Sequence, residues 1–298
     1  MTASVNNRPM VAAVSMMSAM ATVGFIDNFV SVIAEEISLW QFQVMRSTFM
    51  APLLVGMAAI GLGRLRPIRW LPVLARATMI TVAMMLYFAS LGFMPISQAL
   101  AGLFTSPIWV LLIKTIGLKQ RIGPRRIGAV LIGFLGILLV LQPGSDGFGP
   151  LMMMPVAAGF FYAISSIATR SWCEGESAVS MLAANMMMLG LAGLVVSFLV
   201  GPVIPEGVEF VNRVWTWDIA AVLPWVVLQA VGSLGAVFLI IRAYQMDEPT
   251  NVAVFEYTAM LFAPLFAWIL FGQTLSFLQG LGIGMIAASG VVIAVRSK

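Results

Sequence analysis

Long apolar segments are the feature that most constrains how this chain can fold. Ten of them follow one another, each about 16–23 residues long, and roughly 20 residues of helix cross a hydrocarbon layer ~30 Å thick. Charged residues make up only 9% of the 298 residues, whereas a soluble domain carries about 25%. We therefore expect an all-α membrane protein with ten transmembrane helices and no separate soluble domain. The predicted spans are 10–26, 39–60, 70–91, 94–113, 127–142, 151–169, 178–200, 219–241, 250–271 and 275–295.

The composition and the motifs that are missing exclude several classes of chemistry. The chain has no histidine and one cysteine, Cys173, so we expect no histidine-ligated metal, no imidazole proton relay and no internal disulfide. It contains no HExxH, GxSxG or Walker A sequence, which argues against an intramembrane enzyme and against an ATP-driven pump. We therefore expect a protein that is not an enzyme and needs no cofactor or metal.

The distribution of lysine and arginine predicts the orientation in the membrane. With the N-terminus inside, fourteen of the sixteen basic residues fall on the inner side, Arg213 alone falls outside and Arg46 lies within a span. Basic residues gather on the cytoplasmic side, so we expect both termini in the cytoplasm of a bacterial-type inner membrane. The pI near 9.6 then belongs to these loops and does not indicate a nucleic-acid partner. The inner set is Arg8, Arg64, Arg66, Arg69, Arg76, Lys114, Lys119, Arg121, Arg125, Arg126, Arg170, Arg242, Arg296 and Lys298, and the acids expected outside are Asp27, Glu35, Glu36, Asp146, Glu206, Glu209 and Asp218.

The two halves of the chain resemble each other weakly. Pro95, Ala99, Gly128 and Gly136 recur at one constant offset as Pro249, Ala253, Gly282 and Gly290. We predict a first five-helix repeat over residues 1–145 and a second over residues 146–298. Because five is odd, the second repeat enters the membrane from the opposite side, and inverted repeats around a central cavity are typical of transporters that work by alternating access. A channel, usually assembled symmetrically around one pore, and a receptor with long loops fit this pattern less well.

Two adjoining segments of the first repeat carry a resemblance to a known family. FTSPIWVLLIKTIGLKQ (104–120) is followed by RIGPRRIGAVLIGFLGILLVLQPG (121–144). Within five plus five spans, they resemble the drug/metabolite transporter (DMT) superfamily, EamA-like branch. The resemblance implies that spans 1–4 and 6–9 surround a small-molecule substrate and that spans 5 and 10 lie at the periphery. Members of this branch export amino acids and other metabolites, and related ones take up S-adenosylmethionine or nucleotide sugars.

An acidic residue that is usual in that family is missing here. It precedes the last span of each copy, and the corresponding places hold Lys119 or Gln120 and Gln273 or Thr274. Any role of that acid is therefore absent from this chain.

Two charged residues lie deep within predicted spans. Glu256 is the only charge between Thr250 and Phe271, and Arg46 lies in WQFQVMRSTFM of the second span. A charge in hydrocarbon costs several kcal/mol unless it is paired, neutralised or hydrated. In one interpretation Arg46 snorkels to a carbonyl or an outer acid, and Glu256 holds a polar contact between helices. In the other, which we favour, both line one wet cavity, where Arg46 binds a substrate carboxylate and Glu256 binds an ammonium group or carries a proton.

Further polar and aromatic residues within the spans are candidate substrate contacts. Any one of them more often bonds two helices together, but as a set they could form a polar cavity. They are Asn185, Gln98, Tyr257, Tyr87, Tyr162, Ser166, Gln229 and Trp109. The candidate hinges, which would kink or start spans 4 and 9, are Pro95, Pro107, Pro249 and Pro264.

Together these features predict a secondary transporter that moves amino acids or similar small zwitterionic metabolites across the inner membrane, with export as the expected direction. The alternative is an uptake carrier for S-adenosylmethionine or another metabolite of the same fold. The expected partners are the substrate, the lipid bilayer and, as a candidate coupling ion, the proton. Gly280, Gly284 and Ala288 form a stripe on the last span that permits close packing within a monomer or in a homodimer.

Overall fold

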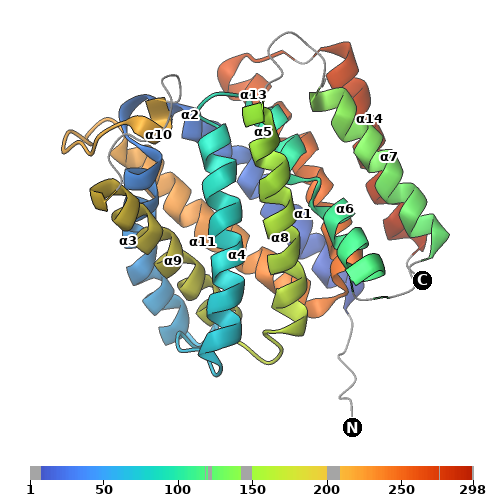
Figure 1. Cartoon of the computed structure of the whole chain (residues 1–298), viewed down its shortest axis with the longest axis horizontal. Coiled ribbons are helices and arrows are strands. Elements are labelled where there is room, and N and C mark those ends of the chain that lie inside the picture. The colour runs from blue at the N-terminus through green and yellow to red at the C-terminus, as the bar shows by residue number, and fades with distance from the viewer. Residues whose placement is uncertain are drawn as a thin grey trace.

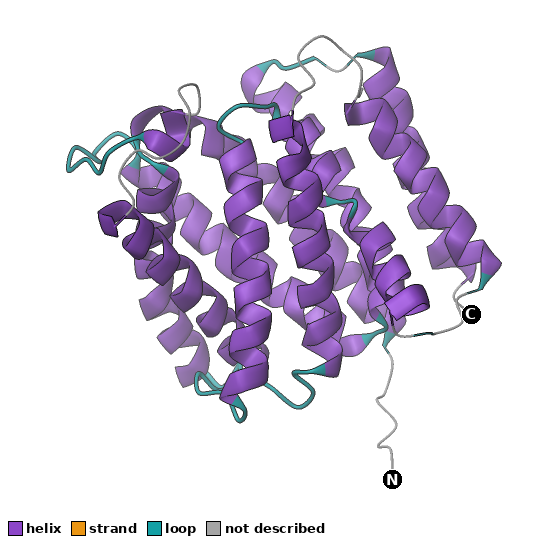
Figure 2. Ribbon diagram, viewed as in Figure 1, coloured by secondary structure: helices purple, strands orange, loops and turns teal. Residues whose placement is uncertain are grey.

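The described part of the chain is helical, and no strand occurs in it (Figure 2). The computed structural model describes residues 8–117, 119, 123–141, 150–199, 209–274 and 276–296. The α-helices are α1 (Pro9–Ile26), α2 (Val30–Glu36), α3 (Leu39–Ala59), α4 (Trp70–Ser90), α5 (Ile96–Leu103), α6 (Ser106–Leu112), α7 (Pro124–Leu141), α8 (Met154–Ser171), α9 (Ala178–Leu199), α10 (Glu209–Asn212), α11 (Leu223–Met246), α12 (Pro249–Val252), α13 (Ala259–Phe271) and α14 (Phe277–Arg296). Shorter turns are the 3-10 helices η1 (Asp27–Phe29), η3 (Pro150–Met153) and η4 (Ala253–Thr258) and the π-helix η2 (Ile113–Gly117).

Six of the described helical segments are long and apolar enough to cross a membrane. They are Pro9–Glu36, Trp70–Ser90, Ile96–Gly117, Ala178–Phe198, Leu223–Met246 and Pro249–Phe271, and shorter apolar helices cover Ile127–Val140 and Phe277–Ile286. These segments make the chain a multi-pass, all-helical membrane protein, whereas the number of ten spans stays a prediction.

The first helical segment runs further than expected. The sequence predicted a span that ends at residue 26 and an outer loop that holds Asp27, but α1, η1 and α2 continue the helix to Glu36. Asp27 is buried and accepts hydrogen bonds from Tyr87 and Gln229. Because these partners satisfy the carboxylate inside the protein, the helix does not have to reach water at its first charged residue.

The packing of the helices repeats between the two halves of the chain. The most extensive contacts join α7 to α14, α4 to α8, α1 to α11 and α3 to α9. Each of these helices has a counterpart in the other half: α1 corresponds to α8, α3 to α9, α4 to α11 and α7 to α14. When every helix is replaced by its counterpart, the same four contacting pairs result. The helices α7 and α14 lie together at one edge of the molecule, and α1 begins at the end where α14 finishes (Figure 1).

Small residues let α7 and α14 approach closely. A Cβ atom on Gly136 would lie against the carbonyl oxygen of Gly282, and the Ser289 hydroxyl donates a hydrogen bond to the Ala129 carbonyl oxygen. These contacts hold the two peripheral helices together within one chain. In the stripe expected on the last span, Gly280 and Gly284 face open space.

Two further helical segments are interrupted near the candidate hinges, at Phe104 and Thr105 in the first and at η4 in the second. Pro107 stands in the first turn of α6, just after the interruption at Phe104 and Thr105, and Pro264 lies inside α13. Pro95 caps α5 and Pro249 begins α12. Proline lacks the N–H that would continue the helix, and such breaks are tolerated within a membrane where other groups satisfy the freed backbone.

Candidate functional site

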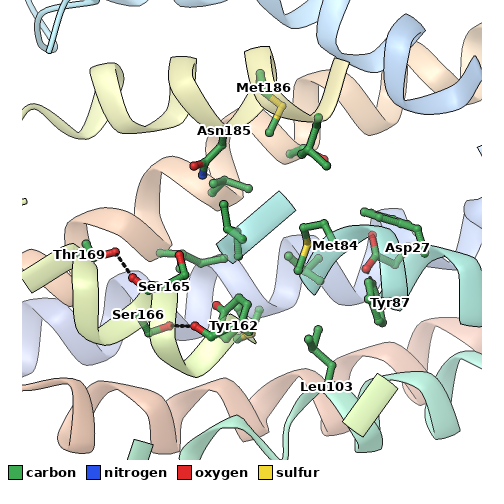
Figure 3. Close-up of a pocket in the computed structure, with 18 of the residues that line it drawn as sticks. Asp27, Met84, Tyr87, Leu103, Tyr162, Ser165, Ser166, Thr169, Asn185 and Met186 are labelled. Atoms are coloured by element: carbon green, nitrogen blue, oxygen red, sulfur yellow. Dashed lines mark hydrogen bonds between the residues drawn. The ribbon is translucent and has the colours of Figure 1, made fainter. Parts of the chain in front are cut away.

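A small enclosed cavity lies at the centre of the helices. Its volume is about 80 Å³, which holds a few water molecules and is far below the 300–1,000 Å³ of a typical ligand pocket. The lining side chains come from α1, α3, α4, α5, α8, α9, α11 and the turns beside them, and no described residue of α7 or α14 belongs to it. Figure 3 shows Asp27 and Tyr87 at one end of the group and Thr169 at the other.

Asp27 marks one end of the cavity and is held by two neighbours. The Tyr87 hydroxyl donates to Oδ2 at 2.8 Å, and Nε2 of Gln229 donates to Oδ1 at 3.1 Å. Gln229 is itself fixed, because Nε2 also donates to the Ile26 carbonyl oxygen and Oε1 accepts from Ser233. The Asp27 side chain is 5% exposed and forms no ion pair with any described residue.

Arg46 lies at the same end of the cavity but has no hydrogen-bond partner among the described residues. Its guanidinium carbon is 5.3 Å from the centre of the Phe42 ring and 4.8 Å from that of Phe88. It is 3% exposed, and Nε is buried without a partner in the described structure. Asp27 is close enough to act on Arg46 through its charge. The aromatic faces therefore stabilise a cation whose donors remain free.

Arg76 occupies the opposite end and is firmly bonded. Its Nε donates to the Thr169 hydroxyl at 2.7 Å, and Nη1 donates to Oδ1 of Asn185 at 2.7 Å. The positive-inside count used this arginine only as one of the residues on the inner side and did not single it out as a site residue, but Arg76 is 4% exposed and lines the cavity from α4. The same depth argument that singled out Glu256 would have found it, since Arg76 lies six residues, or roughly 9 Å of helix, inside its predicted span.

Thr169 also borders a second, larger pocket, which we call the vestibule. The vestibule has a volume of about 760 Å³ and lies at the end of α8 and α11, on the side that the orientation rule predicts to be cytoplasmic. It contains a salt bridge between Lys114 Nζ and Glu248 at 2.6 Å, and Arg170 Nε lies 3.5 Å from the same carboxylate. One layer of side chains around Thr169 thus separates the cavity from the vestibule.

Glu256 is fully buried, but it is not among the cavity-lining residues. Its Oε2 accepts from the Ser106 hydroxyl at 2.8 Å, and Oε1 accepts a short hydrogen bond from the Tyr244 hydroxyl. Ser106 begins α6 and Glu256 lies in η4, so the contact joins the two broken segments. The Tyr162 hydroxyl is close enough to interact electrostatically with Glu256 but hydrogen-bonds to no described residue. Tyr162 and Tyr244 line the cavity, and Tyr244 connects it to Glu256.

The structure divides the other candidate contacts into two groups. Tyr87, Asn185 and Ser166 line the cavity, as Arg46 and Tyr162 do. Gln229, Gln98, Tyr257 and Trp109 do not line it. Gln229 acts through Asp27, Tyr257 packs against Gly133 of α7, and the Trp109 ring packs edge-on against Phe160 with centroids 5.3 Å apart.

Sequence reasoning missed several residues that face the cavity. They are Asp27, Arg76, Ser165, Thr169, Ser233 and Tyr244. Asp27 directly follows an apolar run, so its position resembled a loop. Serine and threonine are common in spans, where they bond their own helix, as Thr169 does to the Ser165 carbonyl oxygen.

Several buried polar and charged side chains line a small cavity among apolar helices, an arrangement that fits a multi-pass transporter. The comparisons agree with this class: the profile of the EamA-like transporter family matches residues 10–142 and again residues 148–295. The chain belongs to the EamA-like transporter family.

Its relatives include named transporters of different substrates. A riboflavin transporter of Rhizobium johnstonii is 26% identical over 74% of this chain and 68% of its own length. An S-adenosylmethionine uptake transporter of Rickettsia bellii is 23% identical over 61% of this chain and 58% of its own length. A solved crystal structure of 16% identity matches 96% of both chains with a TM-score of 0.69, which shows the same fold.

Proposed function

We propose that this protein is a secondary transporter that exports amino acids or similar small zwitterionic metabolites across the inner membrane. The observation that carries the proposal is Arg46, a buried guanidinium in the central cavity without a hydrogen-bond partner among the described residues. A buried guanidinium that lacks hydrogen-bond acceptors is costly. A substrate carboxylate would accept two parallel hydrogen bonds from the guanidinium fork and neutralise it.

Alternating access is the mechanism that fits the arrangement of the helices. The family profile matches twice, and the contacts persist when the helices of one half are exchanged with those of the other. Both observations support an inverted repeat of residues 1–145 and 146–298, which provides two similar packings open to opposite sides. The cavity of about 80 Å³ is too small for a metabolite and its water, so the helices must separate at one end to admit substrate.

Glu256 is the candidate proton carrier in this transporter. Its two carboxyl oxygens accept hydrogen bonds only from hydroxyl groups among the described residues, and none of the ion pairs in the described structure includes it. A buried carboxyl group without a cation beside it costs less when it holds a proton. Tyr244 would connect this proton to the cavity, so that proton release and substrate binding influence each other.

Uptake of S-adenosylmethionine or a similar metabolite is the second candidate. It is supported by the Rickettsia relatives, which carry that name. S-adenosylmethionine has the same carboxylate and ammonium groups as an amino acid, so Arg46 would act in the same way. Riboflavin lacks a carboxylate, and a riboflavin carrier would therefore not need the free guanidinium.

A binding screen with the purified full-length protein tests the proposal. The probes are L-methionine, S-adenosylmethionine and riboflavin, and the variants are Arg46→Gln and, as a matched control, the exposed Arg66→Gln. We expect R46Q to bind the carboxylate-bearing probe roughly 30-fold or more weakly, since removing one partner of a buried charge pair costs about 2–5 kcal/mol. Calorimetry measures the affinities. Tight binding of riboflavin that is equal in wild type and R46Q would contradict the proposal.

Flux assays would establish whether the protein exports its substrate or takes it up. Cells that express the protein should resist toxic amino-acid analogues if it exports them, and should become more sensitive if it takes them up. A proteoliposome assay with labelled substrate would confirm that the difference reflects transport by this protein.

A further inference from the structure

We propose that Asp27 binds the cationic group of the substrate, with Tyr87 and Gln229 as the residues that position its carboxylate. This inference rests on the proposed function. It names the residue that binds the positive group of the zwitterion, whereas Arg46 binds its carboxylate. Asp27 replaces Glu256 in that role, because Asp27 lines the cavity and Glu256 does not.

The hydrogen bonds around Asp27 leave acceptor capacity toward the cavity. A carboxylate has about four lone-pair sites, and the described structure fills one on each oxygen, from Tyr87 and from Gln229. The Gln229 amide cannot turn away, because Ser233 donates to its oxygen while its nitrogen also bonds the Ile26 carbonyl oxygen. Asp27 is therefore held in one orientation and can accept further hydrogen bonds from a ligand.

Asp27 and Arg46 attract each other without forming an ion pair. No salt bridge joins them in the described structure, although their charges interact. Neighbouring residues of α4 contact each of them separately: Tyr87 donates a hydrogen bond to Asp27, and the ring of Phe88 packs on the Arg46 guanidinium. Two opposite charges in one cavity, each fixed by its own neighbours, match a ligand that carries both charges a short distance apart.

The chemical class that satisfies both poles is the α-amino carboxylate. Its carboxylate and ammonium groups are attached to the same carbon atom, so one small ligand bonds Arg46 and Asp27 together. Met20, Met84 and Met186 line the same cavity, and their flexible thioethers adapt to different side chains. An anion without an ammonium group would satisfy Arg46 but leave Asp27 uncompensated.

Three related probes distinguish binding of the ammonium group from binding of the carboxylate. They are L-methionine, 4-(methylthio)butanoate, which lacks the ammonium group, and 3-(methylthio)propylamine, which lacks the carboxylate. In calorimetry with the full-length protein, we expect wild type to bind L-methionine at least 10-fold more tightly than either analogue. Asp27→Asn should lose this preference over the butanoate while keeping its affinity for the butanoate within 3-fold. The exposed Asp218→Asn is the matched control.

The outcomes distinguish this inference from the proposed function. If Asp27→Asn keeps the wild-type preference for L-methionine over the butanoate, Asp27 does not bind the ammonium group, even where Arg46→Gln has lost both ligands. If wild type binds none of these probes and does not bind S-adenosylmethionine, both proposals are overturned.

A second variant keeps the test informative if Asp27→Asn does not fold. Tyr87→Phe retains the carboxylate but removes one of its donors. We expect this variant to reduce the preference for L-methionine over the butanoate by about 3-fold to 10-fold, with a monodisperse elution profile as the check on folding. An unchanged preference in Tyr87→Phe would overturn the positioning role of Tyr87.

Discussion

The two arginines at opposite ends of the cavity are equally buried but differ in their hydrogen bonds. Arg46 and Arg76 are 3% and 4% exposed and line the same space. Arg76 donates at 2.7 Å to Thr169 and at 2.7 Å to Asn185, whereas Arg46 packs against two aromatic rings and donates to no described residue. A buried charge with its own partners stabilises the fold, and one without partners is available to a ligand.

The same difference assigns a role to each end of the cavity. At the end of Asp27 and Arg46, two opposite charges lie in the same cavity, and we propose that they bind a zwitterion. At the end of Arg76, hydrogen bonds between α4, α8 and α9 close the wall toward the vestibule, because Thr169 borders both spaces. In the proposed transport cycle, substrate that passes toward the vestibule would break the hydrogen bonds of Arg76, whereas substrate that binds would satisfy Arg46.

The largest expected effect is an opposite response of stability and affinity to the two arginine substitutions. Arg76→Gln removes donors from Thr169 and Asn185, and leaving buried acceptors unpaired costs about 1–3 kcal/mol, so its thermal midpoint should fall by several degrees while affinity stays within 3-fold. Arg46→Gln should lose roughly 30-fold or more in affinity, with a midpoint close to that of wild type, because Arg46 forms no hydrogen bond with a described residue that the substitution could break. Thermal unfolding in detergent and calorimetry provide the two measurements.

Equal losses of affinity in Arg46→Gln and Arg76→Gln would contradict the separate roles assigned to the two arginines. It would mean that Arg76 also contacts the ligand, and that the hydrogen bonds of the empty cavity are exchanged for substrate bonds. The exposed Arg66→Gln should leave both measurements unchanged.

The sequence indicated that Arg46 is buried among the spans and that prolines disturb spans 4 and 9, whereas their roles as a substrate contact and as hinges stay predictions. An arginine in an apolar run must face something polar, and prolines interrupt the helical hydrogen bonds wherever they fall. The family resemblance also implied that α7 and α14 stay outside the cavity, and no described residue of either helix lines it.

The surroundings of Asp27 and Glu256 depend on contacts that the sequence does not display. The partners of Asp27 are 60 and 202 residues away, so nothing local indicated that it would be buried. Glu256 was placed on an ideal α-helix, but it lies in the 3-10 helix η4. With 3.0 residues per turn instead of 3.6, a 3-10 helix changes the direction of each successive side chain, and Glu256 faces Ser106 and Tyr244.

A smaller effect is expected when the proton site is neutralised permanently. Glu256→Gln retains a similar shape and can still bond Ser106 or Tyr244, but it cannot exchange a proton. We expect uphill transport driven by a pH gradient in proteoliposomes to fall about 10-fold, while exchange between equal substrate concentrations stays within 3-fold. The exposed Glu209→Gln is the control. If an imposed proton gradient drives no substrate in wild type, Glu256 is not a proton carrier.

The smallest effect we expect is a change in the reactivity of Cys173, which lines the vestibule and interacts electrostatically with Arg76. Burial raises the pKa of the Cys173 thiol, and the charge of Arg76 opposes that rise. Thiolate is the reactive form, so maleimide labelling of wild type should be slow at pH 7 and faster as the pH rises.

Arg76→Gln removes the favourable charge, and through electrostatics alone it would slow labelling further. If Arg76 holds this end of the helices together, its loss should instead expose the buried Cys173 thiol to the reagent and speed labelling about 3-fold. Mass spectrometry of the adduct against time measures the rate, Cys173→Ser is the blank, and Arg76→Lys keeps the charge while it changes the hydrogen bonds. Slower labelling in Arg76→Gln would show that Arg76 acts on the thiol by its charge and does not hold this end of the cavity shut.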